Sequence, residues 1–372
     1  MSQQLTLECK PLEDIKPYRW VTLQEQKQFV DFLKKFGNVG KELLHDGKLE
    51  WCASEYERFS CSNKFDHPKK IRYLACGFRG ICPRDSMVYA HKRANIQYQW
   101  IKINLADKLP FDLKMNQIVL TLPRKFHNMD SKLFTKMVRA FMAKFEAYGY
   151  CVQNTHSKDP LGEKYLHCHV LSLNIKKGSA GIEKSDYYFD VDLMRQRWKE
   201  IISKFTDEQI DGEVNLYTEY ASILKDKPRI VHMLAYLYRY PIQDLFQVQI
   251  RDGSINYLEN SQIDPPNTLQ VDISSKILQL VGQKKTRIVW CGLLTSSKRK
   301  LLMELIGVGE SLWLSLTKIE KMLDQRSKQC VDCGCPYEII PFDRGRYKGD
   351  NEPDNTTTDI KPTIEESCSV PS

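Results

Sequence analysis

The chain has 372 residues, a formal net charge of +8 at pH 7 and twelve cysteines. This length allows two or three domains with a sizeable core, and the positive charge favours an acidic partner such as a nucleic acid. No stretch approaches the roughly twenty apolar residues of a membrane span, and residues 1–16 lack a signal-peptide pattern. We therefore expect a cytoplasmic protein with no membrane partner, whose cysteines are metal ligands or buried thiols and not disulfides.

The N-terminal part of the chain is expected to contain two units. Residues 1–50 predict a helical segment, in which an amphipathic helix over 24–36 ends at Gly37. Residues 51–106 combine four cysteines with aromatic and basic residues and continue into a basic helix over 86–106. This second unit is predicted to be a cysteine-rich zinc module followed by its helix.

The middle of the chain, residues 107–260, alternates between strand and helix patterns. Alternating and β-branched apolar residues predict strands over 116–123, 150–155, 165–173 and 214–220 and a hairpin over 245–258. Apolar spacing near 3.6 residues predicts helices over 131–148, 192–205 and 228–241. The strands on either side of the loop over 156–164 are expected to pair as an antiparallel hairpin, within one α+β domain.

The C-terminal part divides into a helical region and an acidic tail. Residues 261–335 are expected to be mainly helical and to end in a group of three cysteines, Cys330, Cys333 and Cys335. Residues 336–372 are acidic and poor in apolar side chains, so they are predicted to be largely disordered.

Two histidines on one apolar strand are the most informative feature of the chain. Side chains at i and i+2 of a strand share a face, so His167 and His169 present two imidazoles side by side, while Cys168 points to the core. A third metal ligand would come from His156, across the hairpin, or from Glu163 in the loop. Imidazole ligands suit Mn²⁺, and Mg²⁺ is the abundant alternative. The competing interpretation is a histidine pair that binds no metal.

Tyrosines follow in a segment with helical spacing. Tyr236 and Tyr240 are four residues apart and share a helix face, and a nearby metal or Arg239 would stabilise a phenolate. A metal that polarises a phosphate, together with such a phenolate, would cut a DNA strand and leave a 5′-phosphotyrosine link. The competing interpretation is an aromatic stripe that only fills a core.

The cysteines and the basic helix suggest further sites. The N-terminal set that predicts a tetrahedral structural zinc site is Cys52, Cys61, Cys76 and Cys82. His67 or Asp85 could replace one of these ligands, and Cys291 is a candidate fourth ligand for the C-terminal group. Unlinked buried thiols are the alternative in both places. Lys92 and Arg93 on the basic helix are candidate contacts to DNA phosphates, or else part of a solvated helix face, and Arg239 is a further DNA-binding candidate.

With these features in order, the chain resembles the HUH endonucleases, and among them the plasmid rolling-circle replication initiators and the related two-tyrosine insertion-sequence transposases. The resemblance covers roughly residues 75–335. The segments that carry it are 76–83, 118–123, 167–169, 236–240, 252–253 and 290–294. The chain departs from the pattern at Tyr165, where the transposases often have histidine, and at Asp85, where a cysteine is common.

The resemblance implies an antiparallel ferredoxin-like sheet with helices on one side. It also implies that Tyr240 is the first nucleophile, since residues 239–244 are similar to the nucleophile segment of the initiators, and that Tyr236 serves a second transfer. The implied activity is nicking and joining of single-stranded or hairpin DNA at a replication origin. The chain has no Gly-X-X-X-X-Gly-Lys-Ser/Thr loop, so a host helicase and polymerase would be partners. The alternatives are a transposase with the same chemistry and, more distantly, a zinc-containing DNA-binding regulator without catalysis.

Overall fold

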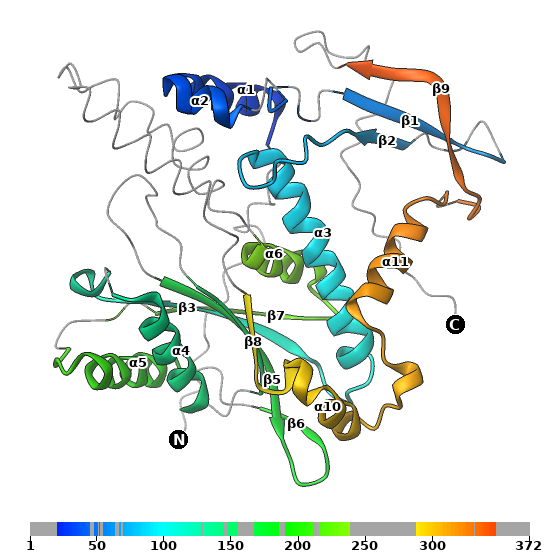
Figure 1. Cartoon of the computed structure of the whole chain (residues 1–372). Helices are drawn as coiled ribbons and strands as arrows, with labels where there is room; N and C mark the ends of the chain where they lie inside the picture. Colours follow the sequence, from blue (N-terminus) through cyan, green and yellow to red (C-terminus); the bar gives the residue numbers. More distant parts are fainter. Residues whose placement is uncertain are drawn as a thin grey trace, which may run out of the picture.

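The computed structural model describes most of the chain between residues 21 and 346. The described ranges are 21–44, 48–50, 52, 55–63, 67, 70–127, 129–144, 148–154, 167–185, 190–210, 214, 216–238, 288–330 and 332–346. A central antiparallel sheet carries helices, and a smaller sheet lies beyond one of them (Figure 1). In these ranges, no helix combines the length and apolar content that a membrane crossing requires.

In the described ranges, the central sheet has six strands. Their bounds are β3 Lys114–Thr121, β4 Tyr148–Asn154, β5 His167–Lys177, β6 Ile182–Lys184, β7 Leu216–Ser222 and β8 Ile288–Cys291. The order is β7-β3-β5-β4-β8, with β6 paired to the end of β5, and every pairing is antiparallel. The predicted pairing of β4 with β5 is confirmed. β8, however, comes from the region that was expected to be helical, so the sheet draws on more of the chain than residues 107–260.

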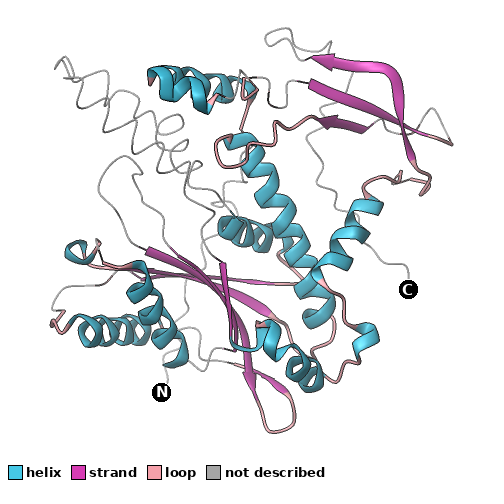
Figure 2. Ribbon diagram, viewed as in Figure 1, coloured by secondary structure: helices cyan, strands magenta, loops and turns pink. Residues whose placement is uncertain are grey.

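Helices cover both faces of this sheet (Figure 2). One face packs against α3 (Pro83–Ile101) and α6 (Lys227–Tyr238), and the other against α4 (Ser131–Lys144) and α5 (Val191–Thr206). The expectation of helices on one side is therefore wrong. The physical reason lies in β5, which is apolar on both faces: Val170 faces α4 and α5, whereas Leu171 faces α3 and α6. Such a strand needs cover on both sides.

Trp198 is the centre of the layer formed by α4 and α5. Its side chain is fully buried, and its ring meets those of Phe134 and Phe141 edge to face at centroid distances of 6.1 and 5.6 Å. The indole Nε1 donates a hydrogen bond of 2.7 Å to the Thr121 carbonyl at the end of β3. The indole thus fixes both helices to the sheet and satisfies its own polar group.

A second sheet joins the two ends of the described chain. It contains β1 (Glu55–Cys61), β2 (Lys70–Tyr73) and β9 (Tyr337–Arg346), in the order β2-β1-β9. The prediction of disorder from residue 336 is therefore wrong for β9, and residues 347–372 lie outside the described ranges. Averaging composition over the whole acidic tail concealed the apolar run Tyr-Glu-Ile-Ile-Pro-Phe that starts this strand.

The remaining helices complete the architecture. The α-helices are α1 Leu23–Lys34, α2 Gly37–Leu43, α10 Arg299–Ile306 and α11 Leu316–Arg326. The shorter turns are the π-helical η2 Lys102–Ala106 and the 3₁₀ turns η3 Arg124–Phe126, η5 Gly292–Leu294, η6 Ser296–Lys298 and η7 Glu310–Leu312. α1 begins with a capping box between Thr22 and Glu25, which satisfies backbone N–H groups at its start. The amphipathic helix expected over 24–36 ends before Gly37, as predicted, and α2 begins at Gly37.

Candidate functional site

The histidine pair lies on β5, between β3 and β4. His167 and His169 are each 9% exposed, and their ring centroids are 5.1 Å apart. Cys168 is fully buried in the core on the opposite face, as predicted. The i, i+2 spacing on a strand therefore does place two imidazoles together on one face.

Gln117, on the neighbouring strand β3, orients one of these rings. Its Nε2 lies 3.0 Å from Nδ1 of His169, and the pair is buried. A metal at Nε2 of His169 requires the ring proton on Nδ1, and the Gln117 amide accepts that proton through Oε1 when it is turned over. Metal-bound histidines are commonly held in this way through their other ring nitrogen. Gln117 was not among the residues singled out from the sequence.

Tyr236 reaches the histidine pair from the overlying helix α6. Its half-buried ring lies 5.5 Å from the ring of His169, centroid to centroid. The ring of His232, one turn earlier on α6, also lies against Tyr236, with a centroid distance of 5.2 Å. The fold thus brings together a predicted nucleophile and a predicted metal ligand that are distant in the sequence.

Several predicted site residues lie outside the described ranges. They are Tyr240, Arg239, His156 and Glu163. Within the described part of the chain, no third His, Cys, Asp or Glu completes a metal-binding group with His167 and His169. The third ligand thus stays a prediction, with His156 or Glu163 as its source.

A buried histidine on α3 lies near this site and was missed by the sequence reasoning. Burial, and then the charge of His232, lower the pKa of His91 to about 4. His91 is 9% exposed and follows the buried Ala90 on the helix face that packs against α6. The sequence offers no signal for this contact, because it depends on how two helices cross.

We expect His91 to make folding stability depend on pH. The unfolded chain takes up a proton near the usual histidine pKa of 6.5, whereas the folded chain resists protonation until about pH 4. The neutral His91 therefore contributes fully to the free energy of unfolding above pH 6.5. This contribution, up to about 3 kcal/mol, is lost as the pH falls from 6.5 to about 4. Urea denaturation across this window should show a shallower pH dependence for His91→Gln than for the wild type. The same slope in both proteins would contradict the assignment.

The first cysteine group combines residues from both ends of the described chain. Cys61, His67, Cys330 and Cys333 place their ligand atoms within 4.8 Å of one another. Desolvation opposes ionisation of Cys330, but backbone hydrogen bonds from Asp332 and Cys333 outweigh it and lower its pKa to about 7. This group could hold a metal ion.

The second cysteine group contains Cys52, Cys76 and Cys82, again with all ligand atoms within 4.8 Å. Hydrogen bonds from the other two thiols lower the pKa of Cys52 to about 4. The hydrogen bond that the Cys76 thiol donates to Cys52 raises the pKa of Cys76 to about 11. Asp85 is adjacent, with its Oδ2 3.9 Å from the Cys76 sulfur. Asp85 is not among the ligand atoms that lie within this distance of one another, so the group offers three ligands in the described part of the chain.

The structure divides the cysteines differently from the sequence-based grouping. Cys61 joins the C-terminal cysteines, and His67 goes with it, instead of completing the N-terminal set. Cys335 belongs to neither group of ligand atoms. Cys291, the suggested fourth ligand of the C-terminal group, lies on β8 opposite Tyr150 in the other sheet. Strand pairing between β1 and β9 is the reason, and chain spacing could not reveal it.

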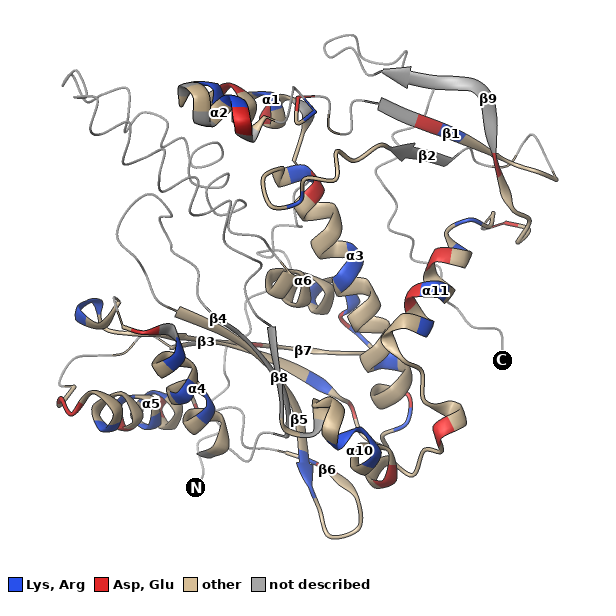
Figure 3. Cartoon of the chain, viewed as in Figure 1, with Lys and Arg blue, Asp and Glu red and all other residues tan. Residues whose placement is uncertain are grey.

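The predicted DNA contacts on α3 already have a protein partner. Glu320 on α11 lies 3.2 Å from Arg93 and 3.7 Å from Lys92. Figure 3 shows basic stretches on α3 and acidic stretches on the neighbouring helix α11. Part of the basic face therefore fastens one helix to the other, and a role of Lys92 and Arg93 in DNA binding stays a prediction.

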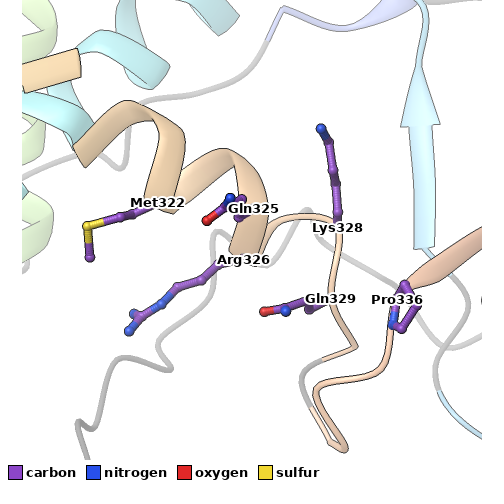
Figure 4. A pocket seen from close by; sticks show the side chains of 6 residues that line it. All are labelled: Met322, Gln325, Arg326, Lys328, Gln329 and Pro336. Atoms are coloured by element: carbon purple, nitrogen blue, oxygen red, sulfur yellow. The ribbon is translucent and has the colours of Figure 1, made fainter. Parts of the chain in front are cut away.

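A surface hollow of about 550 Å³ lies at the end of α11 (Figure 4). Its lining residues are Met322, Gln325, Arg326, Lys328, Gln329 and Pro336. None of these is a histidine, cysteine or carboxylate, and the hollow is on a different part of the fold from the histidine pair. We therefore do not place the candidate active site there.

Comparison with protein-family models, curated proteins and solved structures finds no match to this chain. The resemblance to the HUH endonucleases thus rests on the motifs of the chain alone. Functional assignment depends on what the described side chains can do together.

Proposed function

We propose that this protein is a metal-assisted enzyme that nicks and rejoins single DNA strands through 5′-phosphotyrosine links. The observation that carries the proposal is the contact between Tyr236 and His169, in which a phenol lies against an imidazole of the histidine pair. Either feature alone has an ordinary structural explanation. Their meeting at one partly exposed place favours chemistry that uses both.

Two imidazoles and an orienting amide support the proposal of a divalent metal at this point. His167 and His169 share one face of β5, and Gln117 can hold His169 so that Nε2 is turned to a ligand. His156 is the proposed third ligand. When bound, Mn²⁺ or Mg²⁺ supplies Lewis-acid polarisation of the scissile phosphate.

The tyrosines carry the covalent step. The phenol of Tyr240 loses its proton, its oxygen forms a bond to phosphorus, the bond from phosphorus to the 3′ oxygen breaks, and the 3′ oxygen takes up a proton. Reversal rejoins the strand without ATP, because the phosphotyrosine link retains the energy of the phosphodiester. Tyr236 would make the second transfer, and His232 beside it offers an imidazole that can accept its proton.

The biological setting follows from this chemistry. We propose that the nick initiates rolling-circle replication of a plasmid in the cytoplasm, with a host helicase and polymerase extending the free 3′ end. A transposase would use the same residues and is the alternative. The cysteine groups are also compatible with a non-catalytic DNA-binding regulator, which would not become linked to DNA. Zinc is the ion we propose for the cysteine-rich part, because thiolate and imidazole ligands suit it.

A covalent-capture assay tests the proposed activity. The full chain is incubated with Mn²⁺ or Mg²⁺ and a random single-stranded DNA library labelled at its 3′ end. We expect label that remains on the protein in detergent, because the 3′ fragment keeps the phosphotyrosine link. Tyr240→Phe should abolish this product, whereas Tyr236→Phe should retain the first link and lose the second transfer.

Tyr238→Phe is the matched control, since Tyr238 is buried in the core on the same helix, two residues and so about 200° around the helix from Tyr236. It should label as the wild type does. Wild-type protein that takes up no label with either metal, or a Tyr240→Phe variant that labels normally, would contradict the proposal.

A further inference from the structure

The four ligand atoms of the first cysteine group come from segments that are far apart in the sequence. Cys61 ends β1, and His67 lies between β1 and β2, whereas Cys330 and Cys333 follow α11. Backbone pairing brings these segments together, because Cys61 lies opposite Tyr337 in the β1–β9 register. The site therefore exists only when the two ends of the described chain are assembled.

The turn that carries the C-terminal ligands is suited to a metal. The backbone N–H of Gly334 donates to the Cys330 carbonyl at 2.8 Å, and Cys330 N–H donates to the Cys335 carbonyl at 2.7 Å. Gly334 has φ +72°, which residues with a side chain rarely adopt. This tight Cys-X-X-Cys-Gly turn points both sulfurs toward one place, as in zinc knuckles.

The distances between the ligand atoms agree with one tetrahedral ion. The sulfurs of Cys61 and Cys333 are 3.4 Å apart, and Nδ1 of His67 lies 3.2 Å from the Cys330 sulfur and 3.4 Å from that of Cys333. Tetrahedral zinc with bonds of about 2.3 Å to sulfur and about 2.0 Å to nitrogen separates its ligands by about 3.5 to 3.8 Å. A small outward adjustment thus accommodates the ion. A disulfide between Cys61 and Cys333 would need a sulfur separation of about 2.05 Å, so the thiols are not bonded to each other.

The small sheet takes its strands from distant parts of the chain. Among the side chains that the structure describes on these strands, none belongs to either of the two core clusters. A structural metal can supply folding free energy to a small unit of this kind.

We propose that Cys61, His67, Cys330 and Cys333 bind one Zn²⁺, which clamps the segment after α11, together with β9, onto β1 and β2. Removing the ion should release residues 328–346 from the small sheet while the central sheet stays folded, because both core clusters lie elsewhere. This inference does not depend on strand nicking.

Metal content of the purified full chain tests the proposal. Zinc measured by mass spectrometry should fall by one equivalent per chain in Cys333→Ser and in His67→Asn. Cys335→Ser is the matched control, because Cys335 lies in the same turn but outside the ligand group, and it should keep the wild-type zinc content. Equal zinc content in Cys333→Ser and wild type would overturn the proposal.

Cobalt substitution of the wild-type chain keeps the test decisive if a variant fails to fold. A site of three thiolates and one imidazole should give intense tetrahedral d–d bands and sulfur-to-cobalt charge transfer. Chelator treatment should then expose residues 328–346 to protease, and added Zn²⁺ should restore protection. The proposal would also be overturned by the absence of a tetrahedral spectrum, or by a rate of protease cleavage in this segment that neither chelator nor Zn²⁺ changes.

Discussion

His169→Ala is expected to lower the rate of covalent DNA capture by roughly 10³-fold, because several kcal/mol of transition-state stabilisation by the metal would be lost. His169 has the central place in the site: its ring contacts those of His167 and Tyr236, and Gln117 holds its Nδ1. The measurement is the initial rate of labelled-protein formation with saturating Mn²⁺. This prediction rests on the proposed nicking activity.

Two further variants show whether the loss comes from the metal. Gln117→Ala should lower the apparent affinity of the enzyme for Mn²⁺ by roughly 10- to 100-fold. Excess Mn²⁺ should partly restore the rate, since an orienting residue acts through the ligand that it holds. His127→Ala is the control, because His127 is also a buried histidine, but its Nε2 hydrogen-bonds to the Leu122 carbonyl and not to a residue of the pair. A His169→Ala enzyme as active as the wild type would exclude the metal site proposed here.

Trp198→Ala is expected to destabilise the protein by about 3–5 kcal/mol, the usual cost of removing a fully buried large aromatic side chain. The variant would leave a cavity between α4, α5 and the sheet and would remove the donor to the Thr121 carbonyl. Urea denaturation followed by circular dichroism measures the change in the free energy of unfolding.

Trp198→Phe separates the contribution of aromatic packing from that of the hydrogen bond to Thr121. It keeps an aromatic ring against Phe134 and Phe141 but loses the hydrogen bond, so we expect a clearly smaller loss, of about 1–3 kcal/mol. An alanine variant that loses less than about 1 kcal/mol would show that the side chain does not organise this layer.

Local periodicity was a good guide where neighbouring residues decide the structure. The placement of His167 and His169 on one face of a strand, with Cys168 in the core behind them, follows from the two-residue repeat of a β-strand. The helix that bears Tyr236 follows likewise from apolar spacing after Pro228. These features were predictable because each depends on contacts within a few residues.

Features that depend on distant parts of the chain were not predictable in this way. Three features bring together segments that lie far apart in the sequence. They are the second helical layer, the addition of β8 to the central sheet and the pairing of β9 with β1. The same pairing moved Cys61 from the N-terminal cysteines to Cys330 and Cys333. Spacing can identify residues capable of ligation, but strand register decides which of them meet.

From the amino-acid sequence alone came the chemical types of the site residues: imidazoles on a strand, phenols on a helix and thiols near both ends. Tertiary structure decided that Tyr236 lies against His169, that Gln117 holds the same ring, and that His67 joins Cys61. The physical reason is that side-chain chemistry and short-range periodicity are local properties. The distance between two ligand atoms is instead set by how strands pair and helices pack across the whole chain.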